Sequence, residues 1–101
     1  MLEYEADFHD AMLRIYCQAK KDGYNAMRFQ QMILADGGLA TAKKLLASKG
    51  YSEGLTRLWE MGRLDISMEA LVIKSPWCSL FSEDELEIAR KRLEGCNFKF
   101  E

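Results

Sequence analysis

Glycine residues divide this chain into short segments with helical spacing, and this division constrains the fold more than any other feature of the sequence. The glycines at positions 23, 37, 50, 62 and 95 each follow such a segment. Glycine readily adopts the left-handed conformation that ends a helix. We therefore expect a series of short helices joined by tight turns.

The apolar residues recur at steps of three or four between these glycines, which is the pattern of a helix with one buried face. Within the first segment, Phe8, Met12 and Ile15 follow this spacing. The same reading along the chain predicts helices over about 3–22, 25–36, 39–49, 52–61 and 68–74, and a sixth from 83 to the residue before Gly95. The last residues, 96–101, alternate apolar and polar, so this tail is extended or flexible.

Composition supports an all-α fold. Leu, Met and Ala supply 29 of 101 residues, whereas Val, Ile and Thr, which sheets favour, supply 8. A chain of this length forms one domain and buries enough surface to fold without disulfides. We predict a single domain over residues 1–101, a compact bundle of five or six short helices.

Three helix starts carry specific capping signals. Ser82 and Glu85 have the spacing of a capping box, Ser67 precedes the fifth helix as its N-cap, and Asn25 is the expected N-cap of the second. Pro76 keeps the fifth helix from continuing. A 3₁₀ turn is expected between Pro76 and Ser82.

The string LTRLWEMGRLDIS at positions 55–67 is the most specific motif in the middle of the chain. Weaker motifs lie at 24–25, 28–29, 32, 37–38, 43–48, 54, 69 and 87–90, so the set spans about residues 24–93. Together they resemble a type of small bacterial all-helical domain that occurs alone or attached to larger proteins, some of them nuclease-like. This resemblance implies a small helical module and carries no catalytic residues.

The segment around Gly62 allows two interpretations. Trp59 and Arg63 could contact a partner, Arg63 by holding a carboxylate or phosphate in bidentate fashion. Alternatively, Gly62 ends a helix, Trp59 fills the core beside Leu58, and Arg63 pairs with a nearby acid, Glu60 or Asp65.

An enzyme or a metal centre is not expected. His9 is the sole histidine, so most catalytic and zinc-binding residue sets lack a member. Asp7 and Asp10 flank it, but we interpret them as acids of a solvated first helical turn. Gly37-Gly38 lacks the preceding strand and the lysine of a phosphate loop, so we expect it to end one helix and begin the next. No cofactor is expected.

The three cysteines, Cys17, Cys78 and Cys96, are far apart and form no CxxC pair. This pattern, with no recognisable signal peptide and no apolar run of about 18 residues, predicts reduced thiols in a cytoplasmic protein without a membrane span.

The alternative function is a nucleic-acid-binding protein of helix-turn-helix type, or an accessory domain of a nuclease-type system. Residues 39–61 have the outline of a helix-turn-helix, but the second helix would present one base against two acids. Fourteen basic residues meet sixteen acidic ones, so there is no basic excess. The candidate nucleic-acid contacts are Lys43, Lys44, Lys49, Arg57, Arg90, Lys91 and Arg92.

A protein-interaction module, adaptor-like or inhibitor-like, is the function we expect. Eleven aromatic residues are many for a helical domain of this size, and several lie near connections where they could meet another protein or a second copy in a homodimer. They could equally cover the open ends of the bundle. Six methionines suggest core filling, or an adaptable binding groove. The candidate partner contacts are Trp59, Arg63, Trp77, Phe81, Phe98 and Phe100.

Overall fold

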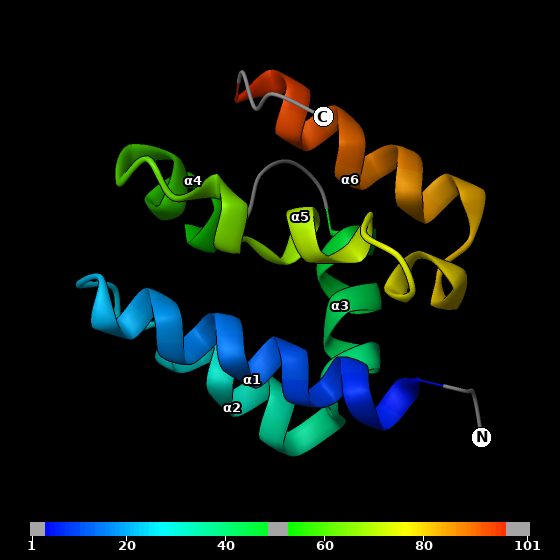
Figure 1. Cartoon of the computed structure of the whole chain (residues 1–101), viewed down its shortest axis with the longest axis horizontal. Helices are drawn as coiled ribbons and strands as arrows, with labels where there is room; N and C mark the ends of the chain where they lie inside the picture. The colour runs from blue at the N-terminus through cyan, green and yellow to red at the C-terminus, as the bar shows by residue number, and fades with distance from the viewer. Residues whose placement is uncertain (1–3, 49–52, 97–101) are drawn as a thin grey trace.

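The structure is a computed structural model that describes residues 4–48 and 53–96. Within these ranges all regular structure is helical, as the sequence predicts (Figure 1). The helices are α1 (Glu5–Lys21), α2 (Met27–Asp36), α3 (Gly38–Ala47), α4 (Glu53–Glu60), α5 (Met68–Val72) and α6 (Glu83–Gly95). Two 3₁₀ turns, η1 (Leu64–Ile66) and η2 (Trp77–Leu80), complete the order. The predicted ends differ from these by two residues at most, which is the usual fraying of helix termini.

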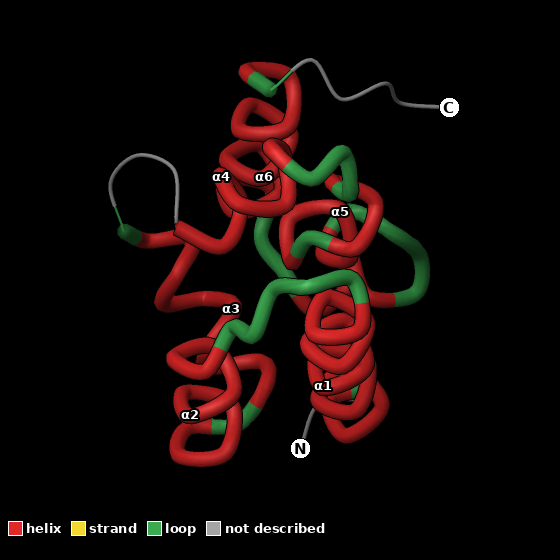
Figure 2. Tube along the Cα trace, turned by 90° about the vertical axis from the view of Figure 1, so that its left-hand side faces the viewer, coloured by secondary structure: helices red, strands yellow, loops and turns green. Residues whose placement is uncertain are grey.

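The helices form two groups in space. Helix α2 runs back along α1, and α3 packs against both of them, while α4, α5 and α6 lie together on the other side (Figures 1 and 2). Helix α3 also contacts α6, so it links the two groups. None of the helices along these two ranges is long and apolar enough to cross a bilayer.

The core follows the predicted apolar stripes. Phe8 and Met12 of α1, Ile33 of α2, and Ala42 and Leu46 of α3 are almost completely buried in one cluster. Burying such side chains is the main favourable term in folding, at roughly 25 cal/mol for each Å² of apolar surface. The register of the helices is therefore set by these stripes.

A second, smaller cluster joins α4 to the last helix. Leu55, Leu64, Ala70, Leu93 and Cys96 form it. It lies on the α4–α6 side of the molecule and gives α4 its packing surface. The two clusters share contacts through a half-buried isoleucine at position 73.

Two of the three predicted caps are confirmed, and one is wrong. The Ser67 hydroxyl accepts the N–H of Ala70, and Ser82 and Glu85 form the full capping box. Helix α2, however, begins after Ala26 with no side-chain cap. The Asn25 side chain instead accepts a hydrogen bond from the Tyr16 hydroxyl at 2.9 Å, so a contact with α1 replaces the local cap.

The junction between α2 and α3 uses two glycines for two different reasons. Gly37 has a φ of 89°, in the region that favours glycine, and it alone separates the two helices. A Cβ on Gly38 would lie 2.6 Å from the Cα of His9 in α1. The absence of a side chain at Gly38 therefore allows α1 and α3 to cross in backbone contact, and the double glycine turns the chain as predicted.

Candidate functional site

A cavity of about 440 Å³ opens between α2, α3 and α4, with α1 and α5 behind it. Its lining is mostly apolar, and the exposure of the lining residues changes with depth. The side chains at its mouth are exposed: Asn25, Met27, Arg28 and Ser48. Those at its floor are buried: Tyr16, Ala19, Ala26, Leu55, Leu58, Met68 and Glu69. The apolar cavity is thus an opening from the surface into the core.

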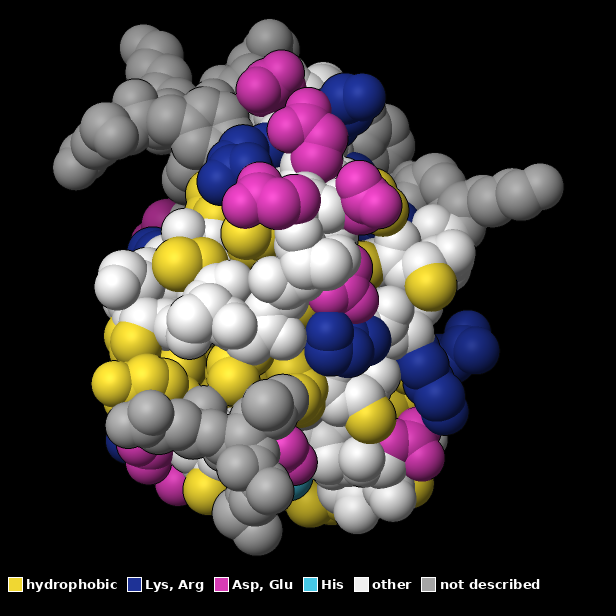
Figure 3. All heavy atoms as spheres, turned by 90° about the vertical axis from the view of Figure 1, so that its right-hand side faces the viewer, with side chains coloured by type: hydrophobic (Ala, Val, Ile, Leu, Met, Phe, Trp, Pro, Cys, Tyr) yellow, Lys and Arg dark blue, Asp and Glu magenta, His cyan; other side chains and the backbone are white. Residues whose placement is uncertain are grey.

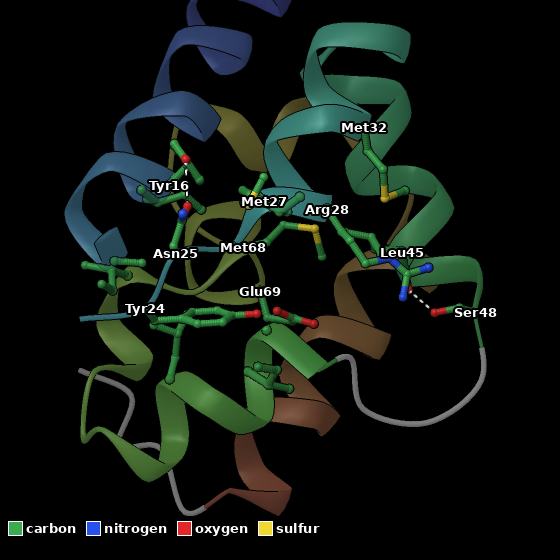
Figure 4. Close-up of a pocket in the computed structure, with 18 residues that line it drawn as sticks. Tyr16, Tyr24, Asn25, Met27, Arg28, Met32, Leu45, Ser48, Met68 and Glu69 are labelled. Carbon is green, nitrogen blue, oxygen red and sulfur yellow. Dashed lines mark hydrogen bonds between the residues drawn. The ribbon is translucent and has the colours of Figure 1, made fainter. Parts of the chain in front are cut away.

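Methionines give the apolar cavity much of its wall. Met27 and Met32 come from α2, and Met68 begins α5. In Figure 4 these three side chains lie in the upper part of the view and Tyr24 in the lower part, and the Glu69 carboxylate lies near the end of the Tyr24 side chain. Methionine is flexible and polarisable, so such a wall adapts to the shape of what it contacts.

Two tyrosines hold the chain between α1 and α2 in place beside the cavity. Tyr16 donates its hydroxyl hydrogen to Asn25, as described above. The guanidinium of Arg57 lies 5.5 Å from the centre of the Tyr24 ring, a cation–π contact that joins α4 to this connection. The connection is therefore attached at two points.

The polar feature of the floor is a buried ion pair. Glu69 is 1% exposed and Arg92 is 6% exposed, and the Arg92 Nη1 donates to the Glu69 Oε2 at 3.2 Å. Burial raises the pKa of the Glu69 carboxyl, while its own backbone N–H and the Arg92 guanidinium act in the opposite direction. The sequence indicates no functional role for Glu69, and position 69 is named only within the resemblance.

Arg92 also ends α3. Its guanidinium donates to the backbone carbonyls of Leu45, Leu46 and Ser48, at 3.1, 3.4 and 2.8 Å. The last carbonyls of a helix have no partner within the helix, so this side chain supplies one from another helix. Arg92 is therefore an interior structural residue, and its interpretation as a nucleic-acid contact is wrong.

The predicted aromatic contacts have different surroundings. Trp59 is 50% exposed, so its expected place in the core is wrong. Leu55 and Leu58 occupy the inward positions of α4, and Trp59 lies about 40° around the helix from Leu55, at the edge of the apolar face. Trp59 remains available to a partner.

Trp77 and Phe81 cover an end of the bundle. Both pack against Phe8, with ring centroids 5.9 and 5.4 Å away. Phe81 is buried and Trp77 half-buried, so of the two open interpretations, covering the core describes this pair better. Phe98 and Phe100 lie outside the described residues.

Arg63 forms the predicted corner. Its guanidinium donates to Asp65 at 3.2 Å and also to Asp22, at the end of α1. The acid from α1 is a contact that the sequence did not indicate, because it lies 41 residues away. The Asp22 and Asp65 carboxylates therefore take up the Arg63 donors that could otherwise bind a ligand carboxylate.

The predicted cations mostly meet acids. Lys43 pairs with Glu85 at 2.8 Å and Lys44 with Asp36 at 2.8 Å, while Arg57 and Arg90 each lie 4.0 Å from an acid three residues away. Lys91 is exposed, and Lys49 lies outside the described residues. On the face in Figure 3, Lys and Arg side chains lie beside Asp and Glu side chains rather than in a patch of their own.

His9 has a structural contact. Its Nδ1 accepts the backbone N–H of Gly38 at 2.9 Å, which gives the first N–H of α3 a partner. Among residues 4–48 and 53–96, no three His, Cys, Asp or Glu side chains gather closely enough to hold a metal ion. Cys17 is exposed, Cys78 half-buried and Cys96 buried, all three as free thiols.

No protein-family model, curated protein or solved structure matches this chain. The resemblance to a bacterial helical domain therefore stays a prediction, and inferences about function depend on the geometry of the chain.

Proposed function

We propose that this protein is a small protein-interaction module that holds an apolar segment of its partner in the cavity between α2, α3 and α4. One observation carries the proposal: the apolar cavity is open to the surface, and Met27 at its mouth is 54% exposed. Removing the surface of an exposed methionine from water is favourable, so a partner that covers it and the apolar opening beside it would be stabilised in the complex.

The shape of the cavity agrees with how protein interfaces gain their affinity. A few large side chains that enter desolvated pockets supply most of the binding energy in such interfaces. Most of the floor is apolar, with Leu55, Leu58 and Met68 buried there. A partner side chain that entered would therefore gain contacts on all sides.

The observations favour this function over nucleic-acid binding. Phosphate neutralisation needs several free Lys or Arg side chains on one face. Arg92 is inside the protein, and Lys43 and Lys44 form short ion pairs with acids of their own chain. We therefore propose a protein as the partner, with a second copy of the chain among the possible partners.

A photo-cross-linking experiment tests this proposal. A benzoylphenylalanine residue replaces Met27 in one variant and Leu34 in a control variant; Leu34 is 67% exposed on the same helix but does not line the cavity. We expect a cross-linked protein partner in native cells only with the residue at position 27, and loss of that product when Met32→Glu is added. Equal products from both positions, or products only with nucleic acid, would contradict the proposal.

A further inference from the structure

The floor of the apolar cavity contains a carboxylate whose orientation is fixed. Arg92 holds one oxygen of Glu69, and Arg92 is itself fixed by three carbonyls at the end of α3. Glu69 thus lines the cavity without freedom to turn away, because its partner has none. A carboxyl group offers an acceptor oxygen in either protonation state.

The walls around this carboxylate suit an aromatic ring. Two aromatic residues, Phe29 and Tyr24, and two methionines, Met32 and Met68, line the cavity. Sulfur–aromatic and ring–ring contacts add to the stability gained by burying an apolar group. The floor and walls together therefore match a flat side chain with a hydrogen-bond donor at its far end.

The mouth adds a preference of charge. Arg28 is exposed there and forms no ion pair with the acids of residues 4–48 and 54–96. A carboxylate next to the buried side chain would pair with this guanidinium.

We propose that the partner segment inserts a tryptophan or tyrosine into the apolar cavity, next to an acidic residue. The indole N–H or phenol O–H donates to Glu69, and the neighbouring acid meets Arg28. This inference rests on the proposed function, since it names the side chain that the interaction module recognises. A site with a buried acceptor discriminates against an analogue that lacks the donor, because the acceptor then loses its solvent without a replacement.

The test compares three probes by nuclear magnetic resonance: the N-acetyl amides of tryptophan, tyrosine and phenylalanine. Protein labelled with carbon-13 in the methionine methyl groups reports their binding, because Met27, Met32 and Met68 line the cavity. Met12, which is fully buried and does not line it, is an internal control. We expect saturable shifts at Met32 and Met68, none at Met12, and binding of the tryptophan and tyrosine amides about tenfold tighter than that of phenylalanine.

Two outcomes would overturn the inference. Equal affinity for the three amides would refute the donor requirement while leaving an apolar cavity for the proposed function. No saturable shift with any amide would refute the aromatic anchor, whereas the proposed function is judged separately by the cross-linking experiment. The comparison uses the unmodified protein, so it does not depend on a variant that folds.

A charge-neutral variant extends the test. Arg28→Gln changes an exposed residue at the mouth, so folding should be unaffected. The variant should bind the N-acetylated dipeptide aspartyl-tryptophan amide several-fold more weakly than the native protein does. Its affinity for N-acetyl tryptophan amide should stay unchanged. An equal effect on both probes, or on neither, would refute the role given to the acid.

Discussion

Replacement of Arg92 by methionine should remove much of the stability of the fold. In the native protein the guanidinium of Arg92 pairs with Glu69 and donates to three carbonyls at the end of α3. Methionine replaces the unbranched apolar part of the arginine side chain but has no donor group, so the Glu69 carboxylate would remain buried without its partner. Breaking a buried ion pair in this way costs about 3–5 kcal/mol.

This loss is large for a domain of 101 residues, whose total stability is about 5–15 kcal/mol. Urea unfolding followed by circular dichroism measures it. With a slope of about 2 kcal/mol per molar urea, a loss of about 4 kcal/mol lowers the midpoint by about 2 M. The slope itself should stay unchanged if only stability has changed.

Two comparisons show which interaction is responsible. Lys91→Met changes the exposed neighbour of Arg92 and should alter stability by less than about 0.5 kcal/mol. The double variant Glu69→Leu with Arg92→Met removes both charges and should recover about 2 kcal/mol or more of the loss. A single Arg92→Met variant within about 1 kcal/mol of the native protein would refute this account. If the double variant is no more stable than the single variant, the lost stability comes from the hydrogen bonds between Arg92 and the α3 carbonyls.

Three further predictions concern the crossing of α1 with α3, the acid side of the stability profile, and the thiols. Gly38→Ala places a Cβ 2.6 Å from the backbone of His9, so the helices must separate, and thermal unfolding should show a loss of about 1–3 kcal/mol; an unchanged melting temperature would contradict backbone contact there. Burial raises the pKa of the Glu85 carboxyl, but hydrogen bonds from Lys43 and from the backbone N–H of Ser82 outweigh burial, so the net pKa lies below 4.5. The ionised carboxylate therefore stabilises the fold above pH 4.5, and this stabilisation is lost as the pH falls. Urea midpoints measured from pH 7 to pH 3 should therefore decline less in Glu85→Gln than in the native protein, and parallel profiles would refute this assignment. Burial also raises the pKa of the Cys96 thiol, so a thiol reagent should modify exposed Cys17 in the native state and Cys96 only after unfolding; equal rates would show that Cys96 is accessible.

The sequence predicted contacts between near neighbours well. Ser82 meets Glu85 three residues later, and the Ser67 cap is equally local. Such contacts depend only on the backbone of one helix start, which is the same in any fold. The buried stripes were predicted for a related reason, since helical geometry decides which residues of one helix share a face.

Contacts between helices were not predictable from the sequence. His9 and Gly38 are 29 residues apart, and Arg92 reaches carbonyls 44 to 47 residues earlier. Which helices meet is decided by the packing of the whole domain. A basic residue at the end of a helix usually faces solvent, so the pattern around Arg92 indicated the wrong environment.

The apolar cavity escaped sequence reasoning for the same reason. Its walls come from five helices and the connections between them, and each contributes residues that resemble ordinary core or surface positions. The number of methionines was a signal, because an adaptable groove was one interpretation of it. Asn25 shows the opposite case: its local capping signal was clear, but the Tyr16 hydroxyl competes for the same side chain.

The corner between α2 and α3 determines how the cavity can adjust. Gly37 is the only residue between the two helices, and Gly38 is in close contact with α1, so α2 and α3 have little room to move apart. Met27 and Met32 line the cavity from α2, and Leu45 lines it from α3. Partner side chains of different shape would therefore be accommodated by rotation of the methionine side chains. Complexes with different partners should accordingly differ in their methionine rotamers and have the same helix positions.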